Sequence, residues 1–441
     1  MLFEASLTRV LSSGLIITSI LAGKASALPG RTVTTRTKVP LDSTAHSWTY
    51  VIPSHVQDGA ARVRFDIPTT GSKLDTQALL TLDSPQLSIL NSSVFDWWYF
   101  DAVSAQDPRE SLTVTFFTAT AAAFPWLPSN ESSVLIAYLW ISFANGTILE
   151  EYVPATIATV VGGQGASSPS SGNWSSTGFS WAALKDDLSA YEVIISSEKL
   201  QVEGRFSLTS TLGPHLPCGI TSESTTLEFA PHIGWAALKP NAVGQVDINV
   251  KGSRLQFQGP AYHDKRPRAK IRKNWSDRPF AESVQSWYWG HGQIGPYSVV
   301  WFSYLALDDP SQTTYVSSYV ARDGQVLVSS CNSTVLTVRP IGDPETGARY
   351  PPLAGDIPDG FHLQFDLGEE GWLRANVSGT RIAGDGKYYF RWAGTMTGEV
   401  SQSEAERSQN ACDAGCSSIT ARDAESVLTG SAIFEQFVLA E

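Results

Sequence analysis

Short apolar or alternating segments follow one another along the chain from residue 45 onward, and this pattern restricts the fold more than any other feature. Typical segments are LTVTFFT at 112–118, VLIAYLWISF at 134–143 and SVVWFSYL at 298–305, with glycine, proline and asparagine between them. Such segments and breaks are typical of β-strands and turns. The best candidate for a helix is short, at 403–409. The chain is therefore predicted to be all-β, built as barrels or sandwiches.

A weak internal repeat suggests that two halves are built on one plan. FDWWYF at 95–100 leads into one predicted strand, and SWYWG at 286–290 leads into another. We place the division at residue 268. This gives two predicted β domains, at 28–268 and 269–441.

Residues 1–27 have the order of a secretory signal peptide. A short apolar run, Val10–Gly23, ends in Ala25-Ser26-Ala27, which fits a small-residue cleavage site. The run is too short for a membrane span, and no later apolar run is long enough for stable membrane insertion. We therefore expect a protein of the secretory pathway.

Glycosylation sequons support the same expectation, because an Asn-x-Ser/Thr triplet is used only in the secretory pathway. Seven asparagines begin such triplets: Asn91, Asn130, Asn145, Asn173, Asn274, Asn332 and Asn376.

The four cysteines are Cys218, Cys331, Cys412 and Cys416. Three pairings are open in an oxidising compartment. The Cys412-x3-Cys416 spacing favours a local disulfide over a metal site, because no second ligand pair stands nearby.

Charge and missing motifs exclude several functions. A net charge of −12 argues against nucleic-acid binding. The basic run Lys265–Lys273 is interpreted as a solvated surface loop rather than an anion site. The chain has no nucleophile elbow, HExxH, Walker loop or dinucleotide fingerprint, which disfavours hydrolases and cofactor-dependent redox enzymes. No metal site or cofactor is predicted.

The most distinctive segment is Asp96–Asp101. Strand alternation places Asp96, Trp98 and Phe100 on one face and Trp97, Tyr99 and Asp101 on the other. Large aromatic residues on both faces predict burial on both sides. A carboxylate there needs hydrogen bonds, so Asp96 is either an acid facing a pocket or a structural group.

Two further clusters hold histidines. One is Tyr262-His263-Asp264, and the other is Trp287-Tyr288-Trp289-Gly290-His291. Both histidines could act as acids, bases or donors, although a structural histidine is the more common outcome. Adjacent strand residues point in opposite directions, so His263 and Asp264 are not expected to form a dyad.

At these residues the chain resembles the hydroxyneurosporene-synthase-like superfamily of tandem lipocalin-like domains. The matching motifs are DWWYF at 96–100, Tyr262–Asp264 with Asn274-Trp275, and WYWG at 287–290. Within it, the layout is similar to the fungal Diels-Alderases. The resemblance implies a pocket at the domain interface and a cofactor-independent cycloaddition of a polyketide or terpenoid. One such reaction joins a tropolone quinone methide to a humulene-type sesquiterpene.

A pericyclic reaction needs a shaped apolar wall and a few donors. Our candidates for the wall are Trp98, Tyr99, Trp287, Trp289 and Trp392. Those for polar contacts are Asp96, Tyr262, His263 and His291. Two alternatives stay open: an isoprenoid hydratase or dehydratase with Asp96 or Asp264 as its acid, and a non-catalytic carrier of an apolar ligand.

The chain departs from the family motif at one place. About eight extra residues, Arg266–Lys273, separate Lys265 from Asn274-Trp275. They are either a surface loop or an error in the gene model.

The predicted processing is directly testable. We expect the mature chain to begin near Leu28 and to lose mass on treatment with an N-glycosidase when it is produced in a fungal host. Intact-mass spectrometry measures both. An unprocessed chain whose mass does not change would contradict the secretory assignment.

Overall fold

Antiparallel strands make up almost all of the described chain, so the predicted all-β class is confirmed. The only helices among the described residues are two 3₁₀ turns, η1 (Phe280–Glu282) and η2 (Gly368–Glu370). No helix in this part of the chain is long and apolar enough to cross a bilayer. The computed structural model describes residues 37–41, 45–61, 66–70, 73–74, 82–129, 132–163, 170–219, 224–231, 233–265, 279–307, 309–345, 347–384, 386–401 and 427–439.

Some sequence predictions fall outside these residues and stay predictions. They are the signal peptide at 1–27, the division at residue 268, the short helix at 403–409, the insertion Arg266–Lys273 with Asn274-Trp275, the sequon at Asn130, and Cys412 and Cys416.

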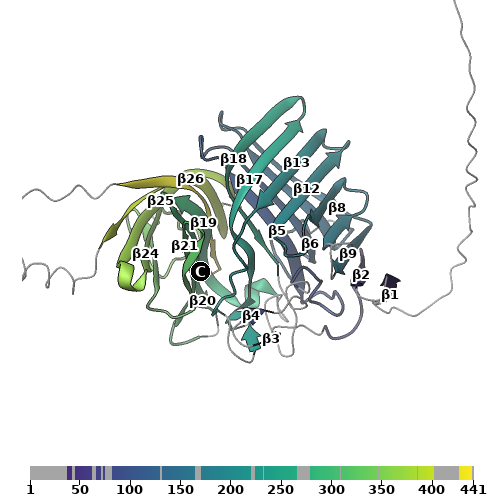
Figure 1. Ribbon diagram of the computed structural model, residues 1–441, viewed down its shortest axis with the longest axis horizontal. Helices are drawn as coiled ribbons and strands as arrows, with labels where there is room; N and C mark the ends of the chain where they lie inside the picture. The colour runs from purple at the N-terminus through teal and green to yellow at the C-terminus, as the bar shows by residue number, and fades with distance from the viewer. Residues whose placement is uncertain are drawn as a thin grey trace, which may run out of the picture. The chain divides into compact units, whose positions relative to one another are not determined.

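The first large sheet has thirteen strands, all from the part of the chain before residue 265 (Figure 1). In spatial order they are β1 (Thr37–Leu41), β2 (Ala45–Pro53), β9 (Ile157–Gly163), β10 (Ser171–Trp174), β11 (Phe179–Ala183), β12 (Ala190–Ser197), β13 (Val202–Thr209), β17 (Ala237–Val250), β18 (Ser253–Asp264), β5 (Phe95–Val103), β6 (Ser111–Ala119), β7 (Leu135–Ser142) and β8 (Ile148–Pro154).

The second large sheet has nine strands, all from residue 284 onward. In spatial order they are β22 (Gln325–Ser330), β21 (Thr314–Arg322), β20 (Tyr297–Ala306), β19 (Val284–Ile294), β27 (Leu428–Val438), β26 (Tyr389–Ser401), β25 (Trp372–Gly384), β24 (Gly360–Asp366) and β23 (Leu336–Ile341). Two small sheets are formed by β14 (Ser224–Thr226), β3 (Asp66–Thr70) and β4 (Lys73–Leu74), and by β15 (Glu228–Ala230) and β16 (Ile233–Gly234).

Strand β5 is buried on both faces, as its sequence predicts. Trp98 is fully buried in the core of the first sheet, where its ring lies 5.2 Å from that of Trp174. Tyr99 points the other way, and its ring lies 5.6 Å from that of Trp289 on β19. Aromatic edge-to-face pairs of this kind add to the free energy of burial. The two faces of β5 therefore pack in two different apolar regions. One lies inside the first sheet, and the other is shared with the second sheet.

A disulfide and a buried histidine also link the two parts. Cys218 is bonded to Cys331, which settles one of the pairings that the sequence left open. Nearby, His215 hydrogen-bonds through Nε2 to Ser317 Oγ and through Nδ1 to Ser329 Oγ, both at 2.9 Å. Burial lowers the pKa of His215 to about 3, so this ring is neutral at physiological pH.

Lys265 corrects one expectation from the sequence. It begins the basic run that we interpreted as solvated, but its side chain is buried and its Nζ lies 2.5 Å from Asp96 Oδ1. The ammonium also lies 3.2 Å from the centre of the Trp98 ring. The backbone N–H of Gln86 donates to the other oxygen of Asp96. A buried carboxylate is stable only when it is neutralised and hydrogen-bonded, and Asp96 has both kinds of partner.

We predict that Asp96→Asn lowers the free energy of unfolding by about 3–5 kcal/mol, because it removes the carboxylate that neutralises buried Lys265. Denaturant titration followed by tryptophan fluorescence measures the change. Asp107→Asn breaks the exposed pair with Arg109 and is the matched control, with an expected cost below about 1 kcal/mol. Adding Lys265→Met to Asp96→Asn should recover most of the loss. If Asp96→Asn costs no more than Asp107→Asn, Asp96 is not the structural partner of Lys265.

Candidate functional site

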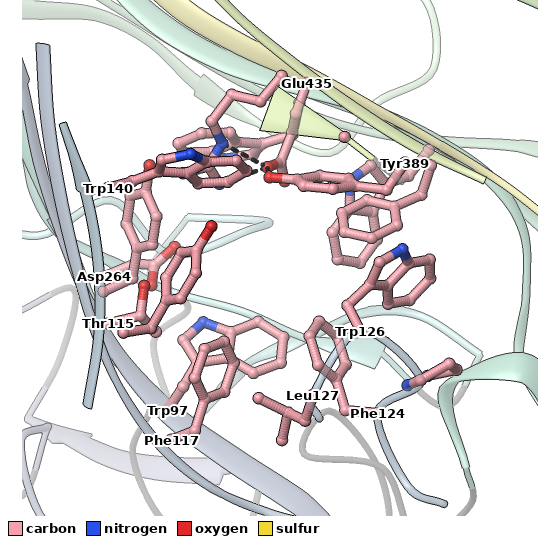
Figure 2. A pocket seen from close by; sticks show the side chains of 18 of the residues that line it. Trp97, Thr115, Phe117, Phe124, Trp126, Leu127, Trp140, Asp264, Tyr389 and Glu435 are labelled. Carbon is pink, nitrogen blue, oxygen red and sulfur yellow. Dashed lines mark hydrogen bonds and ion pairs between the residues drawn. The ribbon is translucent and has the colours of Figure 1, made fainter. Parts of the chain in front are cut away.

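A cavity of about 300 Å³ lies between side chains of the two large sheets. This volume is at the lower end for small-molecule sites. Figure 2 shows Trp97 and Phe117 across the cavity from Glu435 and Tyr389. The lining is Trp97, Tyr99, Thr115, Phe117, Phe124, Pro125, Trp126, Leu127, Tyr138, Trp140, Glu150, Tyr152, Trp235, Asp264, Trp287, Trp289, Phe302, Gly384, Tyr389, Arg391, Glu435 and Phe437.

Strand periodicity explains most of this lining. Residues two apart on a strand share a face, and seven of the strands that border the cavity contribute alternate residues. The pairs are Trp97 and Tyr99 on β5, Thr115 and Phe117 on β6, Tyr138 and Trp140 on β7, Glu150 and Tyr152 on β8, Trp287 and Trp289 on β19, Tyr389 and Arg391 on β26, and Glu435 and Phe437 on β27.

Part of the lining is open to solvent. Glu150 on the edge strand β8, Pro125 and Gly384 are the exposed members of the lining. The residues on the central strands β19 and β27 are buried. We call the part of the cavity at these buried residues its inner end.

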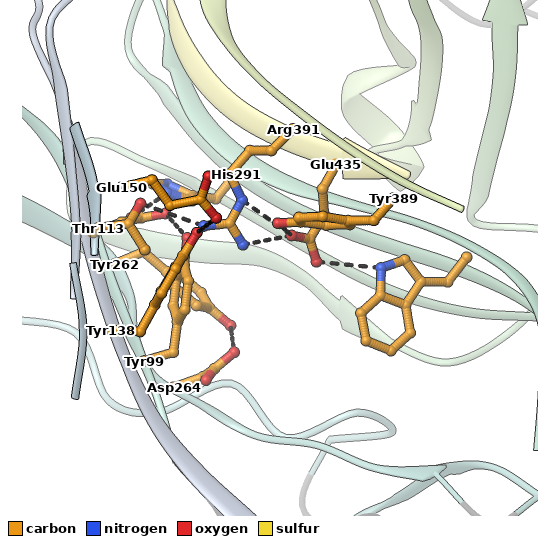
Figure 3. A network of polar contacts seen from close by, with 12 residues as sticks. Tyr99, Thr113, Tyr138, Glu150, Tyr262, Asp264, His291, Tyr389, Arg391 and Glu435 are labelled. Carbon is orange, nitrogen blue, oxygen red and sulfur yellow. Dashed lines mark hydrogen bonds and ion pairs between the residues drawn. The ribbon is translucent and has the colours of Figure 1, made fainter. Parts of the chain in front are cut away.

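A buried ion pair forms the polar part of the inner end. Arg391 donates through Nη2 to Glu435 Oε2 at 2.5 Å, and its Nε donates to the same oxygen at 3.1 Å (Figure 3). Tyr389 also donates to Glu435 Oε2, at 2.9 Å, and Trp287 Nε1 donates to Oε1 at 3.2 Å. These donors hold the Glu435 carboxylate and orient the guanidinium. The guanidinium carbon lies 5.0 Å from the centre of the Tyr99 ring.

Each of the three carboxyl groups in the lining accepts a hydrogen bond from a tyrosine. Tyr389 donates to Glu435, Tyr152 donates to Glu150 at 3.0 Å, and Tyr262 donates to Asp264 Oδ2 at 3.2 Å. Trp235 Nε1 also donates to Asp264 Oδ2, at 3.2 Å.

Burial keeps these phenols protonated. It raises the pKa of Tyr262 and Tyr389 well above 10, and nearby carboxylates raise both further. Burial also raises the pKa of Tyr99, whose hydroxyl donates to Asp101. The tyrosines are therefore neutral donors at physiological pH, and the polar groups of the cavity are arranged before any ligand binds.

Three of the predicted wall residues line the cavity: Tyr99, Trp287 and Trp289. Two predicted polar residues lie directly behind this wall. Tyr262 packs on Trp289 with 5.1 Å between ring centres, and His291 stacks on Tyr262 and bonds through Nε2 to Asp101 Oδ1 at 2.7 Å. The structure therefore places Tyr262 and His291 as supports of the lining, not in it.

The other predicted site residues lie elsewhere, which corrects their assignment. Trp98 and His263 point into the core of the first sheet, where His263 stacks on Phe100 and bonds to Asp83. Asp96 is the structural partner of Lys265 described above. Trp392 packs against Phe434 in the separate core of the second sheet. Strand alternation is the common reason, because each of these side chains is on the face opposite to a cavity residue.

The polar centre of the site was not predicted from the sequence. Tyr389, Arg391 and Glu435 come from the last two strands, and nothing local sets them apart from other strand residues. For another part of the lining the sequence did contain a signal. Tyr138 and Trp140 alternate within VLIAYLWISF, and Glu150 and Tyr152 alternate in the next strand, so each pair shares one face. The pairing of β26 with β27 sets Arg391 opposite Glu435.

Comparison with known proteins identifies the family of this chain. The family model described as Diels-Alderase-like matches residues 65–339. The quinolone epoxide rearrangement protein asqO of Emericella nidulans is 33% identical over 305 residues, which is 67% of this chain and 76% of the relative. Protein penF of Penicillium thymicola, with the same description, is 30% identical over 338 residues, 75% of this chain and 88% of the relative. The Diels-Alderase pyiF of Pyricularia grisea is 25% identical over 260 residues, 58% of this chain and 57% of the relative.

Among solved structures, the crystal structure of CghA with Sch210972 has a TM-score of 0.61 at 14% identity and covers 89% of this chain and 99% of CghA. This likeness concerns the fold. The family model matches more than half of the chain, and two relatives are at least 30% identical over two thirds of it. This chain is therefore an enzyme of the Diels-Alderase-like family.

Proposed function

We propose that this enzyme cyclises or rearranges an apolar, oxygen-bearing small molecule in the cavity, without a covalent bond to the protein. The composition of the lining carries the proposal. Fourteen of its 22 residues are tryptophan, tyrosine or phenylalanine, and the described lining contains no serine, cysteine, lysine or histidine. Those four are common nucleophiles and bases of hydrolases and transferases, and each carboxyl group of the lining already accepts a hydrogen bond from a tyrosine.

Aromatic walls favour catalysis by orientation. A substrate that fills about 300 Å³ between fixed rings is held in few conformations. Holding reacting atoms in a near-attack pose can lower a barrier by roughly 7–11 kcal/mol in the best cases. Such orientation suits a cycloaddition, which makes its bonds in one step.

The finer form of the proposal is a Diels-Alder or hetero-Diels-Alder cycloaddition. The Diels-Alderase pyiF supports it, as does the family description. The pair of a tropolone quinone methide and a humulene-type sesquiterpene stays one candidate among the substrates. It follows from the resemblance in the sequence.

A second candidate is the acid-assisted rearrangement of an epoxide. Two relatives, at 33% and 30% identity, are described as quinolone epoxide rearrangement proteins. Three carboxyl groups and many aromatic faces line the cavity, and both favour the positive charge that develops when a protonated epoxide opens. Asp264 is the best placed acid because it is buried and lines the inner part of the cavity.

We also propose that the enzyme works in the secretory pathway. The signal-like N-terminus supports this, and so does the position of the sequons that the structure describes. Asn91 is half-buried, and four asparagines are exposed: Asn145, Asn173, Asn332 and Asn376.

Product mass separates the possible reactions. The metabolite that accumulates when the gene is deleted would be purified and incubated with the enzyme, first in water and then in D₂O. A product with the mass of the substrate supports an intramolecular cyclisation or a rearrangement, and a product with the summed mass of two substrates supports an intermolecular cycloaddition. Addition or loss of one water indicates a hydratase or dehydratase, and binding without turnover indicates a carrier. Either of these last two results contradicts the proposal.

Trp97→Ala tests the role of orientation. Removing this half-buried wall residue should slow the reaction by roughly tenfold to a hundredfold, because a misplacement of about 1 Å can cost that much. The stereoisomer ratio of the product should fall as well. Chiral chromatography of timed reactions measures both quantities. Trp392→Phe, in the separate core of the second sheet, is the control and should leave the ratio unchanged; a Trp97→Ala enzyme with an intact ratio would argue against confinement.

Asp264→Asn separates the two candidate reactions. General acid catalysis contributes roughly 10²–10⁴-fold, so an epoxide rearrangement with Asp264 as the acid should lose at least a hundredfold in kcat. A cycloaddition should lose less, because asparagine can still accept the bonds from Tyr262 and Trp235. Single-turnover kinetics with the purified substrate gives kcat, and thermal melting checks the fold. An epoxide-rearranging enzyme that keeps its full rate would remove Asp264 from the mechanism.

A further inference from the structure

Two tryptophans in the cavity wall have indole N–H groups with no hydrogen-bond partner among the described residues. They are Trp140 on β7 and Trp289 on β19, which are 3% and 4% exposed. A buried donor without a partner costs about 1–3 kcal/mol, and native proteins leave few of them. These donors therefore need an explanation.

Other indoles provide the contrast. Trp235 and Trp287 also line the cavity, and their N–H groups donate to Asp264 and Glu435. Trp181 and Trp301 have no partner in the described structure either, but they lie in the cores, where they fill the space that a side chain at Gly172 or Gly290 would need. Among the buried indoles that the structure describes, only Trp140 and Trp289 combine a donor without a partner with a place in the wall of the cavity.

Arg391 and Tyr99 connect the surroundings of the two tryptophans. The guanidinium carbon of Arg391 is 5.5 Å from the centre of the Trp140 ring and 5.0 Å from that of Tyr99. The Tyr99 ring in turn lies 5.6 Å from the ring of Trp289. Trp140 therefore lies beside Arg391, and Trp289 lies beside Tyr99.

The charges in the lining restrict what these donors can bind. Arg391 is the only cationic residue in the described lining, and it is paired with Glu435. Asp264 and Glu150 add two more carboxyl groups. An anionic ligand would therefore be repelled and would lose hydration without a free cation to replace it. A neutral oxygen acceptor has no such cost.

We infer that Trp140 and Trp289 each donate a hydrogen bond to a neutral carbonyl-type oxygen of the substrate. The inference rests on the proposed function and narrows its substrate class to neutral compounds that carry such oxygens among apolar carbons. Carboxylic acids and phosphates are excluded from that class. A donor to a carbonyl also withdraws electron density from the conjugated carbons, which makes them more reactive toward an electron-rich partner.

Three matched probes test this inference by binding alone, so that it can fail separately from turnover. They are fluorenone, fluorene and fluorene-9-carboxylate, which share one carbon skeleton and differ in the oxygen group. Isothermal titration calorimetry with the full chain gives each Kd. We expect fluorenone to bind about three- to tenfold more tightly than fluorene, the range for one neutral hydrogen bond. The carboxylate should bind most weakly.

Trp140→Phe and Trp289→Phe keep an aromatic wall and remove the donor. At least one of them should reduce the preference for fluorenone over fluorene by about threefold or more. Trp97→Phe, across the cavity from Glu435, is the control and should change the Kd of both neutral probes by similar factors. If a variant fails to fold, ¹⁵N-labelled indole resonances of the unmodified protein replace it, and fluorenone but not fluorene should shift at least one of them downfield.

Three outcomes would overturn the inference. The first is equal affinity for fluorenone and fluorene in the unmodified protein, and the second is a preference that survives in both tryptophan variants. The third is tightest binding of the carboxylate. In each of these cases the proposed function still stands, because the cavity binds a small molecule. Binding of none of the probes would overturn the inference and the proposed function together.

Discussion

Strand β5 is buried on both faces, and this requires a second sheet to cover one of them. Its side chains alternate between the core of the first sheet, where Trp98 lies, and the cavity, where Trp97 and Tyr99 lie. A strand covered on one side only would leave a row of large aromatic rings in water. The second sheet covers that row, and the space that its own aromatic side chains leave unfilled is the cavity.

Polar groups are tolerated in this region because each is paired. The Arg391–Glu435 ion pair is buried, and such a pair contributes little net stability once the cost of removing both charges from water is counted. The ion pair instead fixes the positions of the polar groups at the cavity. Tyr389 and Trp287 fix the carboxylate, the carboxylate fixes the guanidinium, and the cavity is left with a polar end that does not need to reorganise during a reaction.

Strand β5 carries a paired carboxyl group on each face, and the two groups have different roles. Asp96 is neutralised by Lys265 inside the first sheet, whereas Asp101, on the other face, accepts bonds from Tyr99 and His291 behind the cavity wall. A carboxyl group in an aromatic strand is therefore not by itself a sign of catalysis. Its role depends on which face it occupies and on what covers that face.

Strand periodicity and side-chain size are local properties, so the all-β class, the two-sided burial of β5 and the importance of the aromatic segments near 96–101 and 287–291 could be predicted from the sequence. Tyr99, Trp287 and Trp289 were also predicted. The packing of the sheets places Trp98, His263 and Trp392 in the cores and brings Arg391 and Glu435 to one cavity with Trp140. Those residues come from strands about 250 to 300 positions apart. Pairing across such distances depends on the register of whole sheets and on the packing of one sheet against another, which no local pattern encodes.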